Sequence, residues 1–384
     1  MSREKVRNKS AKKKATSYFD YNLLFIIIFL IGFGFVMMYS TSSYNAQIKF
    51  GDSAYYLKKQ MLASGIGIVV MLFVTFMDYH IWRRFAPVAY IGSIILILLV
   101  LSPLGMTING ARRWIGIGTS LSFQPAEAAK LGLIVFLAYF IERKSKSIRR
   151  VGTYVMLLMF TGIIAGMIYV ITDNLSSAII VAGIGFVMLF VASPKYSHFI
   201  VTGVIAIAGF VLLMLFEGIV KGSFRFDRIV VWLNPEKYPQ EGGFQVLQAL
   251  YAIGSGGILG KGLGNGIQKL GFVPEAQNDM IFTIICEELG LIGAVAVIGM
   301  FVFMIWRFMI IANNAPDLFG SMLVVGVLAH IAIQVVLNIA VVTNTIPNTG
   351  VTLPFISYGG TSVVFLMMEM GMVLSVSRRI RYEE

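Results

Sequence analysis

The feature that most constrains this chain is a series of apolar stretches, each long enough to cross a lipid bilayer as a helix. About ten such windows occur. Apolar residues make up 57% of the 384 residues and charged residues only 13%, which a soluble protein of this size could not bury. We therefore predict an all-α, polytopic membrane protein with about ten transmembrane helices. The windows lie at 21–40, 56–77, 86–102, 125–141, 152–171, 175–193, 199–216, 280–305, 319–342 and 356–376.

The distribution of basic residues predicts how these spans are oriented. Ten spans place both chain ends on one side of the membrane, and 19 of the 31 Lys and Arg residues fall in the tails and loops of that side. By the positive-inside rule that side is cytoplasmic. The predicted organisation is a basic cytoplasmic tail at 1–16, helices one to seven at 17–216, a large extracytoplasmic loop at 217–279, helices eight to ten at 280–378 and a cytoplasmic tail at 379–384.

Composition also excludes several function classes. The formal charge of +12 lies mostly in tails and loops, so it fits anionic lipid better than nucleic acid. The one cysteine, Cys286, allows no disulfide framework, and three scattered histidines show no metal-ligand spacing. We therefore expect no metal site built from these side chains.

The segment 271–290 concentrates carboxylates where the chain enters the membrane, and ionisable groups at such depth are costly and usually functional. Asp279 lies at the outer mouth of the predicted eighth span. It could be an ordinary helix N-cap or a reactive group. Glu275, four residues earlier, would share its face in a helix. Glu287 and Glu288 lie about 12 Å deeper, and we expect them to cap a helix or pair with a cation.

The segment Gln124 to Lys130, QPAEAAK, opens the fourth span. Pro125 suits the first helical turn and Glu127 suits the positive end of a helix. Lys130, however, points into an apolar helix, three residues from Glu127 and on the same face. Because a buried Lys–Glu pair is costly to keep for stability alone, we interpret it as a site that handles an anion.

Two outer segments carry further candidates. Arg112 and Arg113 suit the head-group interface, and arginine is also well shaped to grip phosphate. Asp173, between the fifth and sixth spans, could pair with a basic residue or cap the sixth helix, and the cap is the simpler interpretation.

Three more patterns surround these candidates. The glycine-rich segment 254–271 matches no nucleotide-binding motif and predicts a loop close to a head group or a neighbouring helix. His330, Gln334 and Asn338 form a polar stripe that indicates interhelical hydrogen bonds. Segment 353–362, LPFISYGGTS, predicts a kinked or re-entrant start to the last span, lining a cavity. In the large loop, an amphipathic piece at 244–253 favours ordered structure.

Four motifs together resemble the SEDS family of FtsW, RodA and SpoVE proteins. They are LPFISYGGTS, QPAE with the following Lys130, RRWI at 112–115, and PEAQNDMIFTIICEELGLIG at 274–293. They cover most of the chain in the family's order. Thr352 stands where RodA-type members usually have Pro, so the chain is more similar to the FtsW and SpoVE types, and we expect the FtsW type. Two departures are Ala126, in place of the usual Ser, and Asn174, which follows Asp173 and alters the local pattern.

The resemblance implies a peptidoglycan glycosyltransferase that polymerises lipid II in cell division. Asp279 matches the family's essential Asp, and Glu127 and Lys130 match its fourth-span pair. As a hypothesis, Asp279 is the general base for the acceptor 4-hydroxyl, while Lys130, Arg112 and Arg113 bind the lipid diphosphate, with or without Mg or Mn. The predicted substrate-binding residues are Glu127, Lys130, Arg112, Arg113, Asp173, Glu275, Gln124 and Ser357.

Two other functions stay open at this stage. A transporter that flips lipid II without chemistry would also use a polar cavity and membrane carboxylates, whereas a scaffold would leave Lys130 and Glu127 unexplained. The partners that the resemblance implies are a class B penicillin-binding transpeptidase and further divisome proteins.

Overall fold

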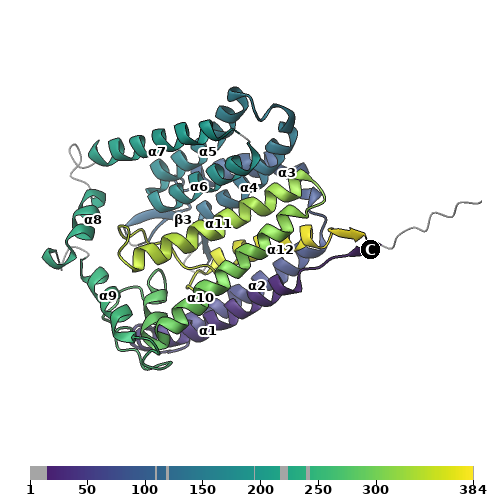
Figure 1. Cartoon of the computed structure of the whole chain (residues 1–384). Coiled ribbons are helices and arrows are strands. Elements are labelled where there is room, and N and C mark those ends of the chain that lie inside the picture. Colours follow the sequence, from purple (N-terminus) through teal and green to yellow (C-terminus); the bar gives the residue numbers. More distant parts are fainter. Residues whose placement is uncertain are drawn as a thin grey trace, which may run out of the picture.

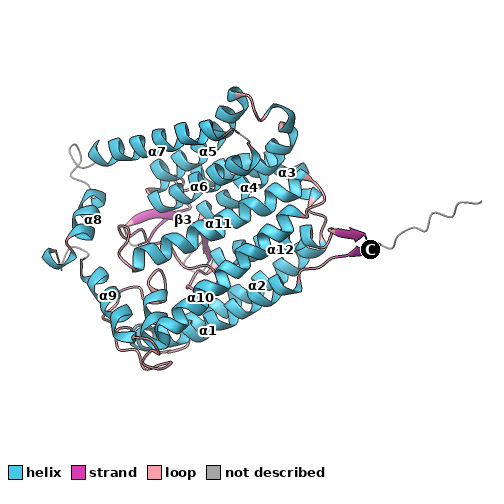
Figure 2. Ribbon diagram, viewed as in Figure 1, coloured by secondary structure: helices cyan, strands magenta, loops and turns pink. Residues whose placement is uncertain are grey.

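The chain folds as a bundle of long helices (Figures 1 and 2). The computed structural model describes residues 15–108, 110–117, 121–193, 195–216, 224–238 and 243–383. Each of the ten predicted windows falls on a helix. These helices are α1 (Tyr21–Phe50), α2 (Tyr55–Phe76), α3 (His80–Leu99), α4 (Pro125–Arg143), α5 (Val151–Thr172), α6 (Leu175–Ala192), α7 (Tyr196–Phe216), α10 (Ile281–Asn313), α11 (Leu318–Val342) and α12 (Thr361–Ser377).

The helical membrane-protein class is confirmed, but a count of ten spans is not. In the described part of the chain, seven helices are long and apolar enough to cross a membrane. They are α1, α2, α3, α5, α6, α10 and α11. The helix α4 is not among them, and it carries Glu127 and Lys130 in its first turns. These charged residues lower the mean hydropathy of α4. Because charges are costly in lipid, they must face other protein groups rather than the bilayer.

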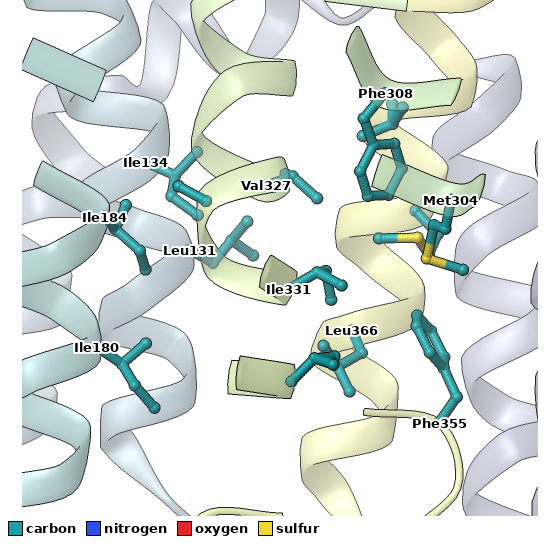
Figure 3. Packing of buried hydrophobic residues seen from close by; sticks show 14 of the residues in the cluster. Leu131, Ile134, Ile180, Ile184, Met304, Phe308, Val327, Ile331, Phe355 and Leu366 are labelled. Carbon is teal, nitrogen blue, oxygen red and sulfur yellow. The ribbon is translucent and has the colours of Figure 1, made fainter. Parts of the chain in front are cut away.

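The helices α4 and α11 run through the middle of the bundle. Most residues of both are buried, and both pack against α6. Figure 3 shows Leu131 and Ile134 of α4 beside Val327 and Ile331 of α11. Polar side chains on these two helices therefore face other protein groups and must find partners there.

Two segments between the predicted windows are more structured than the windows indicate. Helix α1 continues to Phe50, ten residues past its predicted end, and Gly51 ends it with a left-handed φ of 70°. At about 45 Å this helix exceeds the hydrocarbon core, so its polar last turns can continue outside the apolar window. Between the third and fourth windows, the described residues form an antiparallel sheet of β2 (Gly105–Ile108), β3 (Ala111–Ile117) and β4 (Leu121–Phe123).

The described ends of the chain lie together. Strand β1 (Ala15–Ser17) pairs antiparallel with β5 (Arg381–Glu383), as Figure 2 shows. Directly before α1, Asp20 caps this helix by accepting from the Leu23 amide at 2.9 Å. The same carboxylate forms a 2.7 Å ion pair with Arg307 near the end of α10. The first and last described residues thus lie on one side of the bundle.

The large loop is ordered where it is described. It contains α8 (Phe224–Leu233), a 3₁₀ turn at Pro235–Lys237 and α9 (Phe244–Gly256), which flank the bundle in Figure 1. The predicted amphipathic piece at 244–253 lies within α9. Parts of the predicted loop, at 217–223 and 239–242, are outside the described residues.

Helix α10 is broken in its first third. Gly290 has φ 65° and ψ −164°, a conformation open to glycine but not to other residues without strain. The glycine-rich segment fills the break, since the amides of Leu291 and Ile292 donate to the carbonyls of Gly257 and Ile258 at 2.9 and 3.2 Å. The glycine-rich segment therefore lies against a neighbouring helix, one of the two uses that its composition predicts.

Candidate functional site

Asp279 lies in the turns directly before α10, and its side chain is 9% exposed. Its Oδ1 atom is buried and has no hydrogen-bond partner among the described residues. Met280, not Asp279, is the N-cap residue of α10, so the N-cap interpretation of Asp279 is wrong. Burial raises the pKa of Asp279 to about 7, with a further contribution from the charge of Glu275 and opposition from nearby backbone amides and Arg228. An acid with this pKa is suited to exchange a proton near neutral pH.

Two segments far apart in the sequence hold Asp279 in place. The Asn338 side-chain amide of α11 donates to the carbonyl of Asp279 at 2.8 Å and to that of Val351 at 2.7 Å. The Tyr358 amide donates to the carbonyl of Gln277 at 2.9 Å. The motif around Asp279 and the loop between α11 and α12 therefore form one structural unit.

Glu275 lies close to Asp279 but not on the same helical face. Residues 271–280 form turns rather than a helix, and Glu275 itself has a left-handed φ of 53°. Its exposed carboxylate accepts a hydrogen bond from the Asn278 side chain. The predicted shared face is wrong, although Glu275 still raises the pKa of Asp279 through its charge.

Lys130 is buried inside the bundle, with 1% of its surface exposed. Its Nζ lies 2.8 Å from Glu127 Oε1 and 3.5 Å from Gln334 Oε1 on α11. Pro125 stands at the start of α4, and Gln124 is the N-cap residue but makes no side-chain cap bond. The predicted Lys–Glu pair is present, and Glu127 neutralises the buried ammonium of Lys130.

The polar stripe on α11 makes interhelical hydrogen bonds, as predicted. Gln334 Nε2 donates to the Thr352 carbonyl at 3.0 Å, and its Oε1 lies 2.9 Å from His330 Nε2. His330 Nδ1 lies 2.8 Å from Glu369 on α12. A continuous set of polar contacts therefore runs from Lys130 on α4, across α11, to Glu369 on α12.

Arg112 and Arg113 lie on strand β3 and bond to helix ends. Arg112 Nη2 donates to the Ser102 carbonyl at 2.6 Å, just after α3. Arg113 donates to the carbonyls of Thr172 and Asp173 at 3.1 and 2.6 Å. Helix C-termini carry unpaired carbonyls and partial negative charge, so these arginines satisfy them.

Asp173 does not cap the sixth helix. It ends α5 in a left-handed conformation with φ 51°, and its side chain is exposed. The next residue, Asn174, is the cap of α6, because its Oδ1 accepts from the Ser177 amide at 3.0 Å. Asn174, which alters the local pattern after Asp173, thus takes the N-cap role predicted for Asp173.

Ser357 belongs to the loop that precedes α12. Its buried hydroxyl accepts from the Leu353 amide at 2.8 Å, and its carbonyl accepts from Gln60 Nε2 at 3.2 Å. Gln60 Oε1 in turn accepts from the Gly359 amide at 3.2 Å. Sequence reasoning missed Gln60, for which the available signal was a lone carboxamide inside the apolar second span.

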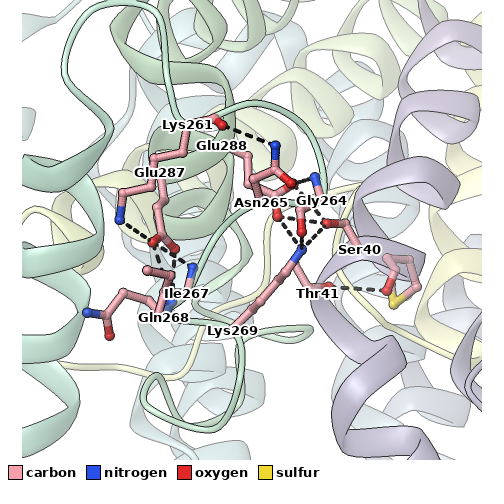
Figure 4. A network of polar contacts seen from close by, with 11 residues as sticks. Ser40, Thr41, Lys261, Gly264, Asn265, Ile267, Gln268, Lys269, Glu287 and Glu288 are labelled. Atoms are coloured by element: carbon pink, nitrogen blue, oxygen red, sulfur yellow. Dashed lines mark hydrogen bonds and ion pairs between the residues drawn. The ribbon is translucent and has the colours of Figure 1, made fainter.

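Glu287 and Glu288 are fully buried and pair with cations, as predicted (Figure 4). Glu287 forms a 2.8 Å ion pair with Lys261 and accepts from the Ile267 amide at 2.9 Å. Glu288 forms a 2.6 Å ion pair with Lys269 and accepts from Ser40 of α1 at 2.8 Å. These two carboxylates hold the glycine-rich segment against α10 and α1.

A cleft of about 710 Å³ lies beside this glycine-rich segment. Its lining includes Phe35 and Tyr39 of α1, Met61 of α2, Leu263 and Lys269. None of the predicted site residues lines it, so we assign it no part in the site.

The structure offers oxygen atoms rather than a His or Cys cluster to a cation. Across the described ranges, no group of three His, Cys, Asp or Glu could hold a metal. The buried oxygens Asp279 Oδ1 and Gln277 Oε1 have no hydrogen-bond partner within those ranges. Carboxylate and amide oxygens suit Mg²⁺. The divalent cation predicted to bind with the lipid diphosphate stays a prediction.

Comparisons with known proteins agree over nearly the whole chain. Residues 21–382 match the family model described as cell cycle protein, of the FtsW, RodA and SpoVE group. The chain is 42% identical to the stage V sporulation protein E of Bacillus subtilis, over 94% of this chain and 98% of that protein. It is 38% identical to a probable peptidoglycan glycosyltransferase FtsW of Trichlorobacter lovleyi, over 94% of both chains.

Solved structures show the same fold. A chain from a peptidoglycan synthase complex, studied for the coordination of polymerization and crosslinking, has a TM-score of 0.77 at 29% identity, over 94% of this chain and 98% of that chain. The rod shape determining protein RodA of Thermus thermophilus has a TM-score of 0.69 at 27% identity, over 95% of this chain and 98% of that chain.

Proposed function

The chain belongs to the FtsW, RodA and SpoVE family, and from this membership we propose that it is a peptidoglycan glycosyltransferase of cell division. Its substrate would be lipid II, a disaccharide peptide carried on undecaprenyl diphosphate, which it would polymerise into β-1,4 glycan strands. The observation that carries the proposal is Asp279, a carboxylic acid that is buried, held by two motifs, and has a pKa of about 7.

In the proposed reaction, the acceptor 4-hydroxyl attacks C1 of the donor sugar. The new bond joins C1 to the 4-oxygen, and the bond between C1 and the diphosphate oxygen breaks with its electron pair. Asp279 takes the hydroxyl proton, and attack from the face opposite the leaving group inverts the α-linked donor to a β linkage. Because the diphosphate leaves as an anion, it needs neutralising charge more than it needs an acid.

Lys130 is the proposed source of that neutralising charge. Its Nζ lies 2.8 Å from the Glu127 carboxylate, and a diphosphate would compete for the same ammonium. A divalent cation bound with the diphosphate would supply further positive charge.

The other predicted substrate contacts keep smaller roles in this proposal. Arg112 and Arg113, on the outer sheet, would act at the rim of the site, as would the exposed Asp173 and Glu275. Gln124 would contact substrate at the start of α4. Ser357 already uses its hydroxyl within its own loop, so it would shape the site through the backbone.

We also propose a class B penicillin-binding transpeptidase and further divisome proteins as partners, with both chain ends in the cytoplasm. Support for the transpeptidase comes from the similarity to a chain of a peptidoglycan synthase complex studied for the coordination of polymerization and crosslinking. Support for cytoplasmic chain ends comes from the basic residues of the tails and from the pairing of β1 with β5 on one side of the bundle.

A lipid II flippase is the second candidate function. The polar contacts between α4, α11 and α12 would suit a translocation route as well as a catalytic site. The two functions differ in product, because only the glycosyltransferase makes glycan chains. Incubating the purified protein and its transpeptidase partner with lipid II, and separating the products by size, distinguishes them. Asp279→Asn should make no glycan, and normal polymerisation by this variant would remove Asp279 from the proposed mechanism.

A further inference from the structure

Two carboxamide side chains on α11 contact the two main candidate site residues, Lys130 and Asp279. Gln334 contacts Lys130, and Asn338 contacts Asp279. The two residues are four positions apart, so they lie on one face of the helix with about 6 Å of axial rise between them. Both side chains are buried, with exposures of 6% and 0%.

The orientation of Gln334 follows from its neighbours. Its Nε2 lies 3.0 Å from the Thr352 carbonyl, which can only accept a hydrogen bond. Its Oε1 must therefore face Lys130 Nζ and His330 Nε2, at 3.5 and 2.9 Å. His330 is held from its other side by Glu369 at 2.8 Å. Gln334 is thus fixed from three directions and presents its oxygen to the ammonium of Lys130.

Asn338 is fixed by two carbonyls. Its Nδ2 donates to Asp279 at 2.8 Å and to Val351 at 2.7 Å, which uses both amide hydrogens. These bonds hold the backbone of Asp279 rather than its carboxylate. They also hold Val351, the residue next to the Thr352 that Gln334 contacts. The two carboxamides therefore donate hydrogen bonds to the backbone carbonyls of two consecutive loop residues, Val351 and Thr352.

We propose that Gln334 and Asn338 are positioning residues that set the separation between the anion site and the base. Gln334 orients the Lys130 ammonium towards the diphosphate, and Asn338 holds Asp279 so that its carboxylate faces the acceptor. This inference rests on the proposed function. It assigns the two neighbouring carboxamides different effects, on substrate binding for Gln334 and on the rate of the chemical step for Asn338.

The test is a comparison of kinetic parameters for lipid II polymerisation by the full chain with its transpeptidase partner. Gln334→Met keeps the shape and removes both hydrogen-bonding groups, and Asn338→Leu does the same one turn later. We expect Gln334→Met to raise KM about tenfold with kcat within about threefold of wild type. We expect Asn338→Leu to lower kcat about 100-fold with KM nearly unchanged, because a small displacement of a base has effects of this size.

Controls separate positioning from a merely structural role. Val336→Ala, on the same helix with a 63% exposed side chain, should match wild type in both parameters. Thermal unfolding of each variant shows whether it is folded, and Asn338→Ser, too short to reach both carbonyls, replaces Asn338→Leu if that variant does not fold. Parallel changes of KM and kcat in both variants, or wild-type values in folded variants, would overturn the inference.

Failure of the proposed function has a different signature. If wild type with its partner makes no glycan, the role of Asn338 is overturned together with that of Asp279. The role of Gln334 is then tested by the affinity for lipid II, which Lys130→Met and Gln334→Met should both weaken. Equal affinities of wild type and Gln334→Met would overturn that part as well.

Discussion

The ammonium of Lys130 lies 2.8 Å from the carboxylate of Glu127, one helical turn earlier on α4, with the lysine side chain 2% exposed and the glutamate 12%. A pair this deeply buried gains little net stability from its charges. A lysine held beside a single carboxylate can exchange that partner for another anion, which is the property a diphosphate site needs.

Lys130→Met should lower the rate of lipid II polymerisation about 100-fold or more, because the leaving diphosphate loses its main positive charge. The measurement is the initial rate of glycan formation. Lys58→Met is the matched control, since Lys58 is 68% exposed and pairs with Asp52 outside the site. Equal losses in the two variants would contradict a specific role for Lys130.

The rate of polymerisation should rise with pH through about 7, the pKa of Asp279, because only the carboxylate can accept the hydroxyl proton. The measurement is kcat/KM between about pH 6 and pH 8.5, in buffers that leave the protein folded. A profile without an ascending limb near the pKa would exclude Asp279 as the base.

The same pKa predicts an opposite trend for stability. Folding raises the pKa of Asp279 from 3.8 to about 7, so the native state binds more protons than the unfolded state between these values. The contribution of this group to stability is present below pH 3.8 and is lost as pH rises through about 7. The largest loss is on the order of 4 kcal/mol, at 1.36 kcal/mol per unit.

Asp279→Asn stays neutral at every pH and should therefore unfold at a higher temperature than wild type above about pH 8. Thermal unfolding of both proteins at two pH values measures the difference. A variant that is inactive yet more stable would show that Asp279 is retained for function and not for folding.

The break in α10 should depend on Gly290. A Cβ at this position would lie 2.4 Å from the Gly260 nitrogen and the Ile258 oxygen, both backbone atoms, and the φ of 65° is unfavourable for alanine. Gly290→Ala should lower the free energy of unfolding by about 3 kcal/mol. Gly299→Ala, later on the same helix with no atom within 4 Å, should change it by less than about 1 kcal/mol. Equal effects of the two substitutions would contradict the packing at the break.

Glu288→Gln should destabilise the glycine-rich segment, because it removes the negative charge that pairs with the buried ammonium of Lys269 at 2.6 Å. Breaking one member of a buried pair costs about 3–5 kcal/mol, whereas removing both is far milder. The double variant Glu288→Gln with Lys269→Met should therefore recover part of the loss in thermal unfolding. A double variant that is less stable than either single one would show that the ion pair is not the cause.

Much of the fold could be predicted because a bilayer imposes a local rule. A span needs a long apolar window whatever else surrounds it, and every predicted window holds a helix. The rule gives no boundary once a helix leaves the membrane, so the continuation of α1 to Phe50 through polar residues was missed. The short strands around Arg112 were missed because they pair only with each other and have no apolar alternation.

Sequence spacing predicted some contacts of the candidate site residues but not others. Lys130 and Glu127 are neighbours on one helix, so spacing was sufficient to pair them. Spacing failed for Glu275 and Asp279, because turns replace the assumed helix. The contact of Asn338 with Asp279 joins residues 59 positions apart, and no local pattern encodes such a bond.

The most direct test of Asp279 as the catalytic base is lipid II polymerisation in detergent with the cognate transpeptidase present, comparing wild type with Asp279→Ala and Glu275→Gln. We predict glycan from wild type and from Glu275→Gln, because the exposed Glu275 would act only at the rim of the site, and none from Asp279→Ala. Glycan from folded Asp279→Ala at the wild-type rate would contradict the assignment of the base, and translocated lipid II without glycan from any of the three would favour a flippase.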